Sequence, residues 1–173
     1  THEYVKEIVL GTRAHVGGMA YDTMNHNLWI TGQGSTWAQA NAITLKHLES
    51  YDFTENYQPI EFDLSYNLYR IQRASFMTYH DGALFVGFFT KDNASIIEKY
   101  LINADGTLYE KSDMNLKRTV GVIDPVACAV SMQVISGKVQ GMAFYNNKIL
   151  LTISWGIMPS EVQIFNYSRY GIL

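Results

Sequence analysis

One seven-residue stretch decides the fold, His15-Val16-Gly17-Gly18-Met19-Ala20-Tyr21. Its pattern returns in two later stretches, Arg73-Ala74-Ser75-Phe76-Met77-Thr78-Tyr79 and Lys138-Val139-Gln140-Gly141-Met142-Ala143-Phe144. Each stretch begins with a basic side chain, has methionine at its fifth position and ends on an aromatic residue. The spacing of roughly 60 residues is typical of a β-propeller-like array. We expect the three methionines to be buried at equivalent positions.

A polar turn and a second apolar run follow each stretch. The turns are residues 25–27, 80–82 and 146–148, and the apolar runs are residues 28–31, 84–87 and 149–152. The turn residues are of the types that tolerate tight or left-handed backbone. Two apolar runs joined by such a turn predict a hairpin, which would form the two inner strands of a propeller blade.

Outer strands are predicted where polar residues begin to interleave with apolar ones. Third strands are expected at residues 42–45, 96–100 and 162–165, and fourth strands at 60–63 and 108–110. The sequence thus predicts an all-β, propeller-like single domain over residues 1–173, with three four-stranded blade repeats at about 12–65, 70–112 and 136–173. We expect the last repeat to lack a fourth strand of its own.

The ends of the array leave two alternatives open. An apolar segment, residues 4–10, is expected to be a strand that either completes the last blade or belongs to a preceding one. Three blades are fewer than the four to eight of closed propellers, so we expect a larger propeller, completed by a missing N-terminal segment, a second chain or self-association. The long connection at residues 113–135 would cover the channel mouth or form an extra outer strand.

Composition excludes few functions. The 173 residues are 47% hydrophobic, enough for the core of one domain, and the net charge of −3 without a basic stripe argues against nucleic acid as a partner. The single cysteine, Cys128, excludes an intrachain disulfide. No apolar run is long enough to span a membrane.

The chain resembles a group of secreted bacterial β-propeller-like repeat proteins, mostly of Gram-positive organisms. The resemblance rests on residues 15–22, which read HVGGMAYD, with 28–32 downstream, and on 139–144 with 150–152 downstream. It implies a propeller-like fold and an extracellular or cell-surface location, and it implies no activity. Members of this group carry further sequence before the first stretch.

The basic residues that open the stretches predict a ligand site. In a propeller, His15, Arg73 and Lys138 would lie at equivalent places around one channel mouth, with Ser75 and Gln140 one pleat further in. The adjoining loops hold Gln33, Trp37 and Trp155, among other residues. Such a pocket suits an anionic small molecule, an acidic sugar or a peptide terminus. Alternatively, acidic residues such as Asp22 or Asp92 neutralise the three basic side chains.

Catalytic patterns are weaker than this binding pattern. The five histidines lack paired metal-ligand spacing, no G-x-S-x-G sequence occurs, and we assign no catalytic residue, metal or cofactor. The first alternative function is a hydrolase or lyase that acts on a saccharide or lactone, with His15 or a carboxylate as acid or base. The second is a scaffold for protein–protein interaction through exposed blade edges.

Overall fold

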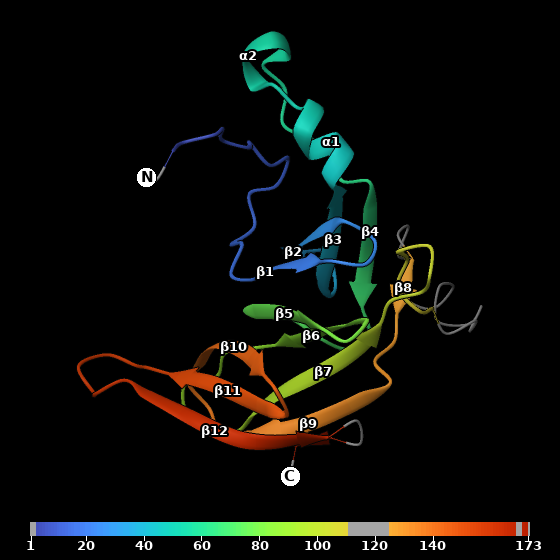
Figure 1. Cartoon of the computed structure of the whole chain (residues 1–173). Coiled ribbons are helices and arrows are strands. Elements are labelled where there is room, and N and C mark those ends of the chain that lie inside the picture. The colour runs from blue at the N-terminus through green and yellow to red at the C-terminus, as the bar shows by residue number, and fades with distance from the viewer. Residues whose placement is uncertain (1–2, 111–124, 169–170, 173) are drawn as a thin grey trace.

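The computed structural model describes residues 3–110, 125–168 and 171–172, and its fold is all-β (Figure 1). Three sheets make up the described part. Sheet I contains β1 (Met19–Asp22), β2 (Asn27–Gln33), β3 (Ala38–Thr44), β4 (Leu64–Leu68) and β8 (Val126–Ala127). Sheet II contains β5 (Phe76–His80), β6 (Ala83–Gly87), β7 (Ser95–Leu101) and β9 (Ser131–Ile135). Sheet III contains β10 (Val139–Tyr145), β11 (Lys148–Ile153), β12 (Glu161–Ser168) and β13 (Gly171–Ile172).

Strand register confirms the predicted inner hairpins. The pairs β1–β2, β5–β6 and β10–β11 are antiparallel neighbours joined at the predicted polar turns. The three methionines occupy the same register, each three residues before the last pair of its hairpin, and they are paired as Met19–Ile30, Met77–Val86 and Met142–Leu151. The third strands β3, β7 and β12 also lie where the sequence predicts them.

The outer strands correct several predictions. Residues 60–63 and 108–110 form only isolated bridges or coil, whereas the fourth strands are β4 and β9, and β13 gives sheet III the fourth strand that the sequence did not predict. Residues 4–9 form no strand, and Leu10 makes one parallel bridge to Ile60. Part of the long connection, β8, extends the edge of sheet I, and its residues 113–124 lie outside the described ones.

Two short helices follow β3. Helix α1 (Leu45–Ser50) begins after Thr44, whose side chain accepts a hydrogen bond from the His47 backbone N–H, and α2 (Phe53–Asn56) is capped in the same way by Asp52. Hydrogen bonds from Thr54 lower the pKa of the exposed Asp52 carboxyl. Figure 1 shows both helices projecting from sheet I, away from sheets II and III.

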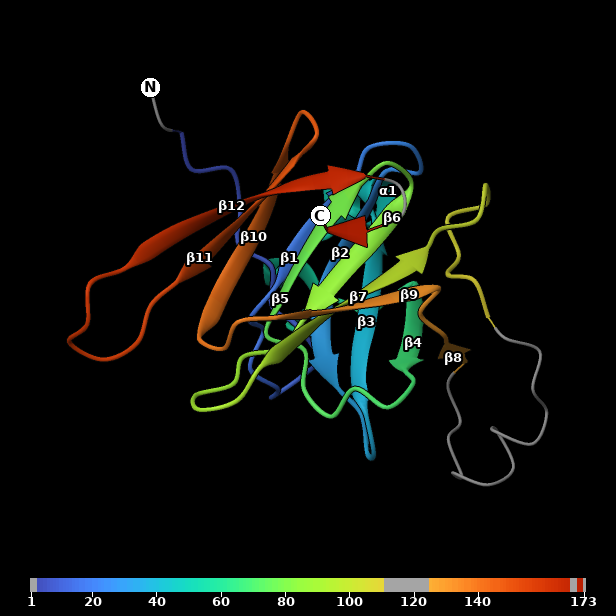
Figure 2. The ribbon, with the colours of Figure 1, turned by 90° about the horizontal axis from the view of Figure 1, so that it is seen from below.

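The sheets stack in one repeated way. We call the side of each sheet that carries the stretch methionine its Met face, and the other side its back face. The Met face of sheet II, with Met77, Leu84 and Val86, packs on the back face of sheet I, with Ala20 and Trp29. The Met face of sheet III then packs on the back face of sheet II, through the residues Met142, Ile149, Leu151, Phe76, Phe85 and Ile97. Accordingly, β5 contacts both β1 and β10 (Figure 2).

The Met face of sheet I has no sheet upon it in the described part of the chain. Ile30 and Ile43 are covered instead by Ile8, Leu10 and Ile60, among other residues. Burial of the methionines differs as a result, since Met77 is 6% exposed and Met142 is partly buried, whereas Met19 is 65% exposed. The prediction of a buried methionine is confirmed for Met77 and wrong for Met19.

An aromatic cluster joins sheets II and III. The His80 ring stacks on Phe144, with ring centroids 4.0 Å apart and planes 4° apart, and Tyr167 meets the same histidine edge-on at 5.7 Å. Phe85 lies against both Phe144 and Tyr167. Desolvation lowers the pKa of His80, with the Lys99 charge adding to the shift and the Asp81 charge opposing it. The packed form of the cluster therefore favours neutral His80.

We expect the folded protein to lose stability as the pH is lowered, because of His80. The unfolded chain binds the proton with the ordinary histidine pKa of 6.5, while the folded protein binds it only at lower pH. Stability contributed by neutral His80 is therefore complete above pH 6.5 and is lost as the pH falls through the pKa of the folded protein. Thermal unfolding of the wild type should show this loss, and His80→Phe, which keeps the stacked ring, should show less of it. An equal pH dependence in both proteins would contradict the assignment.

Candidate functional site

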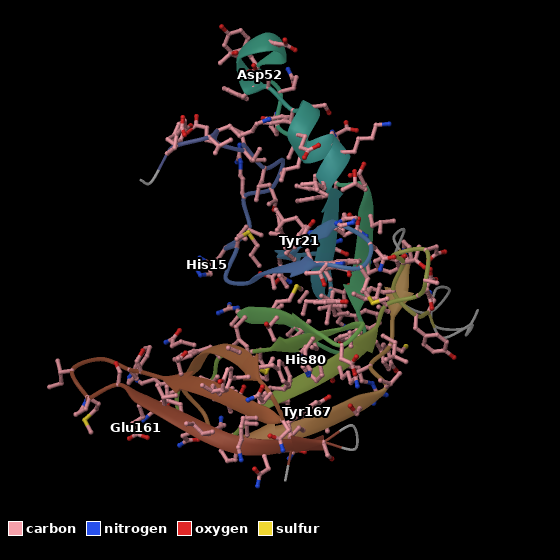
Figure 3. The ribbon with its side chains drawn as sticks, viewed as in Figure 1. His15, Tyr21, Asp52, His80, Glu161 and Tyr167 are labelled. Carbon is pink, nitrogen blue, oxygen red and sulfur yellow. The ribbon has the colours of Figure 1, made fainter. Side chains whose placement is uncertain are left out.

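A pocket of about 380 Å³ opens where β1 and β5 begin. Its walls come from the lead-in to β1, the end of β2 and the lead-in to β5. The lining residues are Ala14, His15, Gly32, Gln33, Arg73, Ala74 and Ser75. The structure thus brings together three residues of the predicted site, His15, Arg73 and Ser75. Figure 3 shows His15 beside the start of β1, in a segment without secondary structure.

Two glycines place these residues side by side. A Cβ atom on Gly17 would lie 2.4 Å from the Ser75 carbonyl oxygen, and one on Gly18 would lie 2.5 Å from the Met77 backbone nitrogen. Because no side chain fits in either place, the lead-ins to β1 and β5 touch through their backbones. His15 and Arg73 each lie two residues before these contacts, so the close approach delivers them to one pocket.

Local hydrogen bonds fix the pocket walls. The Gly18 backbone N–H donates to the Thr31 hydroxyl at 3.0 Å, and the Thr31 backbone N–H donates to the Gly18 carbonyl at 3.0 Å, which ties β1 to the end of β2. On the other wall, the Ser75 backbone N–H donates to the Gly87 carbonyl, and its hydroxyl oxygen accepts from the Phe89 N–H at 3.0 Å. The hydroxyl hydrogen of Ser75 remains available as a donor.

The charge of the pocket is positive and uncompensated. His15 and Arg73 are both exposed, and no carboxylate is among the lining residues. His47 and Asp63 pair with each other, with 3.1 Å between Nδ1 and Oδ1, and neither lines this pocket. Asp22 is buried in the β1–β2 turn, where it accepts hydrogen bonds from Met24 and Asn25. The predicted alternative, in which acidic neighbours neutralise the basic residues, finds no support here.

Lys138 and Gln140 lie one sheet further along, outside this pocket. The Lys138 backbone N–H donates to the Thr90 carbonyl at 2.7 Å, which holds it against the β6–β7 connection of sheet II. Gln140 donates through Nε2 to the Ser154 carbonyl at 3.1 Å. The pocket that contains His15 and Arg73 therefore does not include Lys138, contrary to the predicted convergence of the three residues.

The two predicted tryptophans do not line the pocket either. Trp37 meets the Tyr69 ring edge-on at 5.1 Å, and the Arg70 guanidinium lies over the same tyrosine at 4.8 Å. Trp155 lies 5.4 Å from the Phe89 ring, with the Lys91 ammonium 5.6 Å from its centroid. Each tryptophan belongs to its own aromatic and cationic cluster on a loop. Ala14, Gly32 and Ala74 line the pocket without having been predicted, since small residues carry no chemical signal.

A second pocket, of about 490 Å³, lies between residues 4–7 and 49–55. The Lys6 ammonium donates there to the carbonyls of Leu48, Glu49 and Tyr51, at 3.2, 2.8 and 2.9 Å, and so caps the end of α1. Lys6 is the only lysine among the residues that line this pocket, so its ammonium is already engaged. Several of the other lining residues carry carboxylates. This pocket offers no free cation to an anionic ligand.

A buried acid lies between sheets I and II, away from both pockets. Glu98 is 8% exposed, and its Oε2 accepts a hydrogen bond from the Tyr100 hydroxyl at 2.5 Å. Burial raises the pKa of Glu98, which this hydrogen bond partly offsets. Burial also raises the pKa of Tyr100. The sequence had given no reason to single out this pair, and its surroundings are those of a core.

The described residues contain no cluster of three or more histidine, cysteine or acidic side chains that could hold a metal ion. No helix in the described ranges is long and apolar enough to cross a membrane. Comparisons with protein-family models, curated proteins and solved structures gave no match to this chain.

Proposed function

We propose that this chain is a ligand-binding module whose pocket between β1 and β5 takes a small anionic ligand. The observation that carries the proposal is the meeting of His15 and Arg73 in one pocket without a carboxylate. Arginine offers a planar pair of donors that suits carboxylate or phosphate, and the Ser75 hydroxyl adds a neutral donor beside it. An acidic sugar or a peptide C-terminus has the chemistry that these groups recognise.

The proposed fold around this site is propeller-like, with each sheet as one blade of a repeat array. Support comes from the shared register of the three stretches and from the stacking of each Met face on the preceding back face. The contacts of β5 with β1 and β10 agree with inner strands gathered about an axis. An extracellular or cell-surface location, as in secreted bacterial propeller-like proteins, remains part of the same proposal.

The hydrolase or lyase alternative has less to support it. His15 is the only titratable base among the lining residues, and no second acid or base faces it there. Among the described residues, the Ser75 hydroxyl donates no hydrogen bond to a histidine that could activate it. Binding without turnover is the simpler use of these groups.

The binding proposal can be tested with galacturonate and inorganic phosphate as probes and with galactose as the uncharged control. We expect calorimetry to detect at least one anion and no galactose. Arg73→Met should weaken anion binding about tenfold or more, since a charge-assisted hydrogen bond is lost. Lys138→Met removes the same charge outside the pocket and serves as the matched control.

Two results would contradict the proposal. One is the absence of binding by either anion at millimolar concentration. The other is an equal loss of affinity in Arg73→Met and Lys138→Met, because it would mean that general charge, rather than the pocket, attracts the anion.

A further inference from the structure

The back face of sheet III lies open in the described part of the chain. Strand pairing puts three residues of adjacent strands in one row across the middle of this face, Ala143, Leu150 and Ile164. Ile164 is 62% exposed and Ala143 is exposed, while Val162 beside them is 59% exposed. Figure 1 shows β10, β11 and β12 at the far side of the stack from sheet I. An apolar sheet face of this kind marks an interaction surface.

The equivalent rows in the other two sheets are covered. By register, Ala143, Leu150 and Ile164 correspond to Thr78, Phe85 and Lys99 in sheet II, and to Ala20, Trp29 and Ala42 in sheet I. Trp29 is fully buried and Phe85 is 5% exposed, because the Met face of the next sheet packs on each. Phe144, for example, places its ring centroid 4.7 Å from that of Phe85. Each of these two rows is thus covered by an inner strand of the next sheet, which carries a methionine and, two positions later, an aromatic residue.

This chain carries one such strand that is not used. Met19 and Tyr21 on β1 share the register of Met142 and Phe144, yet they are 65% and 41% exposed. Residues 8–10 cover the part of this Met face around Ile30 and Ile43 and leave the β1 side open. Within one copy, a Met face packs on a back face twice. The described part of the same copy leaves one further Met face open, on sheet I, and one further back face open, on sheet III.

We propose that the chain self-associates head to tail, with the Met face of sheet I of one copy packed on the back face of sheet III of a second copy. Two copies related by a twofold axis satisfy both open faces at once, since each copy gives one face and receives the other. The contact centres on Met19 and Tyr21 of one copy and on Leu150 and Ile164 of its partner. It does not involve the anion pocket, so either proposal can fail without the other.

Sedimentation of the wild-type chain should show a dimer in equilibrium with monomer. Ile164→Lys and Met19→Glu should each raise the dimer dissociation constant about tenfold or more, because each places a charge at the centre of an apolar contact. Met24→Lys is the matched control, since Met24 is 73% exposed on the β1–β2 turn, outside both faces. At a concentration at which the wild type is monomeric, unfolding curves of the variants should match the wild type, because all three side chains are exposed.

Mixing the two variants tests the head-to-tail geometry. A heterodimer of Ile164→Lys and Met19→Glu chains has one wild-type contact and one contact between opposite charges, so the mixture should recover dimer that neither variant forms alone. A wild-type monomer at every concentration tested would overturn the proposal. A dimer lost in Ile164→Lys but kept in Met19→Glu would also overturn it, because sheet III would then pair with itself.

Discussion

Trp29→Ala is expected to destabilise the protein by about 3–5 kcal/mol. The indole is fully buried at the centre of the core between sheets I and II, where it lies 6.2 Å from the Tyr66 ring. No neighbouring strand can collapse into the space, because Ala40 and Ala42 flank it on β3 and their short side chains cannot extend. Chemical denaturation followed by circular dichroism would measure the loss.

Tyr57→Ala is the control for this prediction. Tyr57 is also aromatic, but it is 72% exposed and lies outside all the core clusters. Its substitution should change stability much less than that of Trp29. Equal effects of the two substitutions would mean that the core between sheets I and II is not as described.

Gly18→Ala is expected to cost about 1–3 kcal/mol and to disturb the anion pocket together with the fold. The added methyl would lie 2.5 Å from the Met77 nitrogen and 2.8 Å from the Phe76 carbonyl carbon. These are backbone atoms of β5, so they can yield only if sheets I and II move apart. The shift would also separate His15 from Arg73, and anion binding should weaken along with stability.

Gly82→Ala is the control for this prediction, because it replaces a glycine at a position where no neighbouring atom crowds the added Cβ. Gly82 has a φ of +70°, and nothing lies within 4 Å of its added Cβ, so its cost would come from backbone strain alone. It lies at the β5–β6 turn, and we expect anion binding to be unchanged. Gly18→Ala that kept both stability and anion affinity at wild-type values would contradict the close approach of β1 and β5.

The inner hairpins could be predicted from sequence because their information is local. An apolar run, a polar turn and a second run specify a pair of strands without reference to the rest of the chain, and residues 76–87 follow that rule. The fourth strands are not local. β9 reaches β7 only after a long connection, although Met132 and Val134 alternate with polar residues in a pattern typical of a strand. Residues 60–63 alternate apolar and polar residues as a strand does, but Ile60 pairs with Leu10, and β4 begins only at Leu64.

The site was predictable to a similar extent. Arg73 and His15 could be placed in one pocket because they open equivalent stretches. Lys138 opens its stretch in the same way, but its backbone meets the connection around Thr90, and it is not among the residues that line the pocket. The conformation of a connection depends on tertiary contacts, and no residue pattern specified this one.

The one-sided stacking of the sheets also bears on how the chain loses its structure. Among the described residues of a single copy, sheet II is held by two hydrophobic cores, one on each face, whereas sheet III is held by one. Detaching sheet III breaks a single core and leaves sheets I and II together, while detaching sheet II would break both. Local opening should therefore begin at β10–β13 and cost less free energy than global unfolding, as at the end of a linear array of elements that each touch only their neighbours.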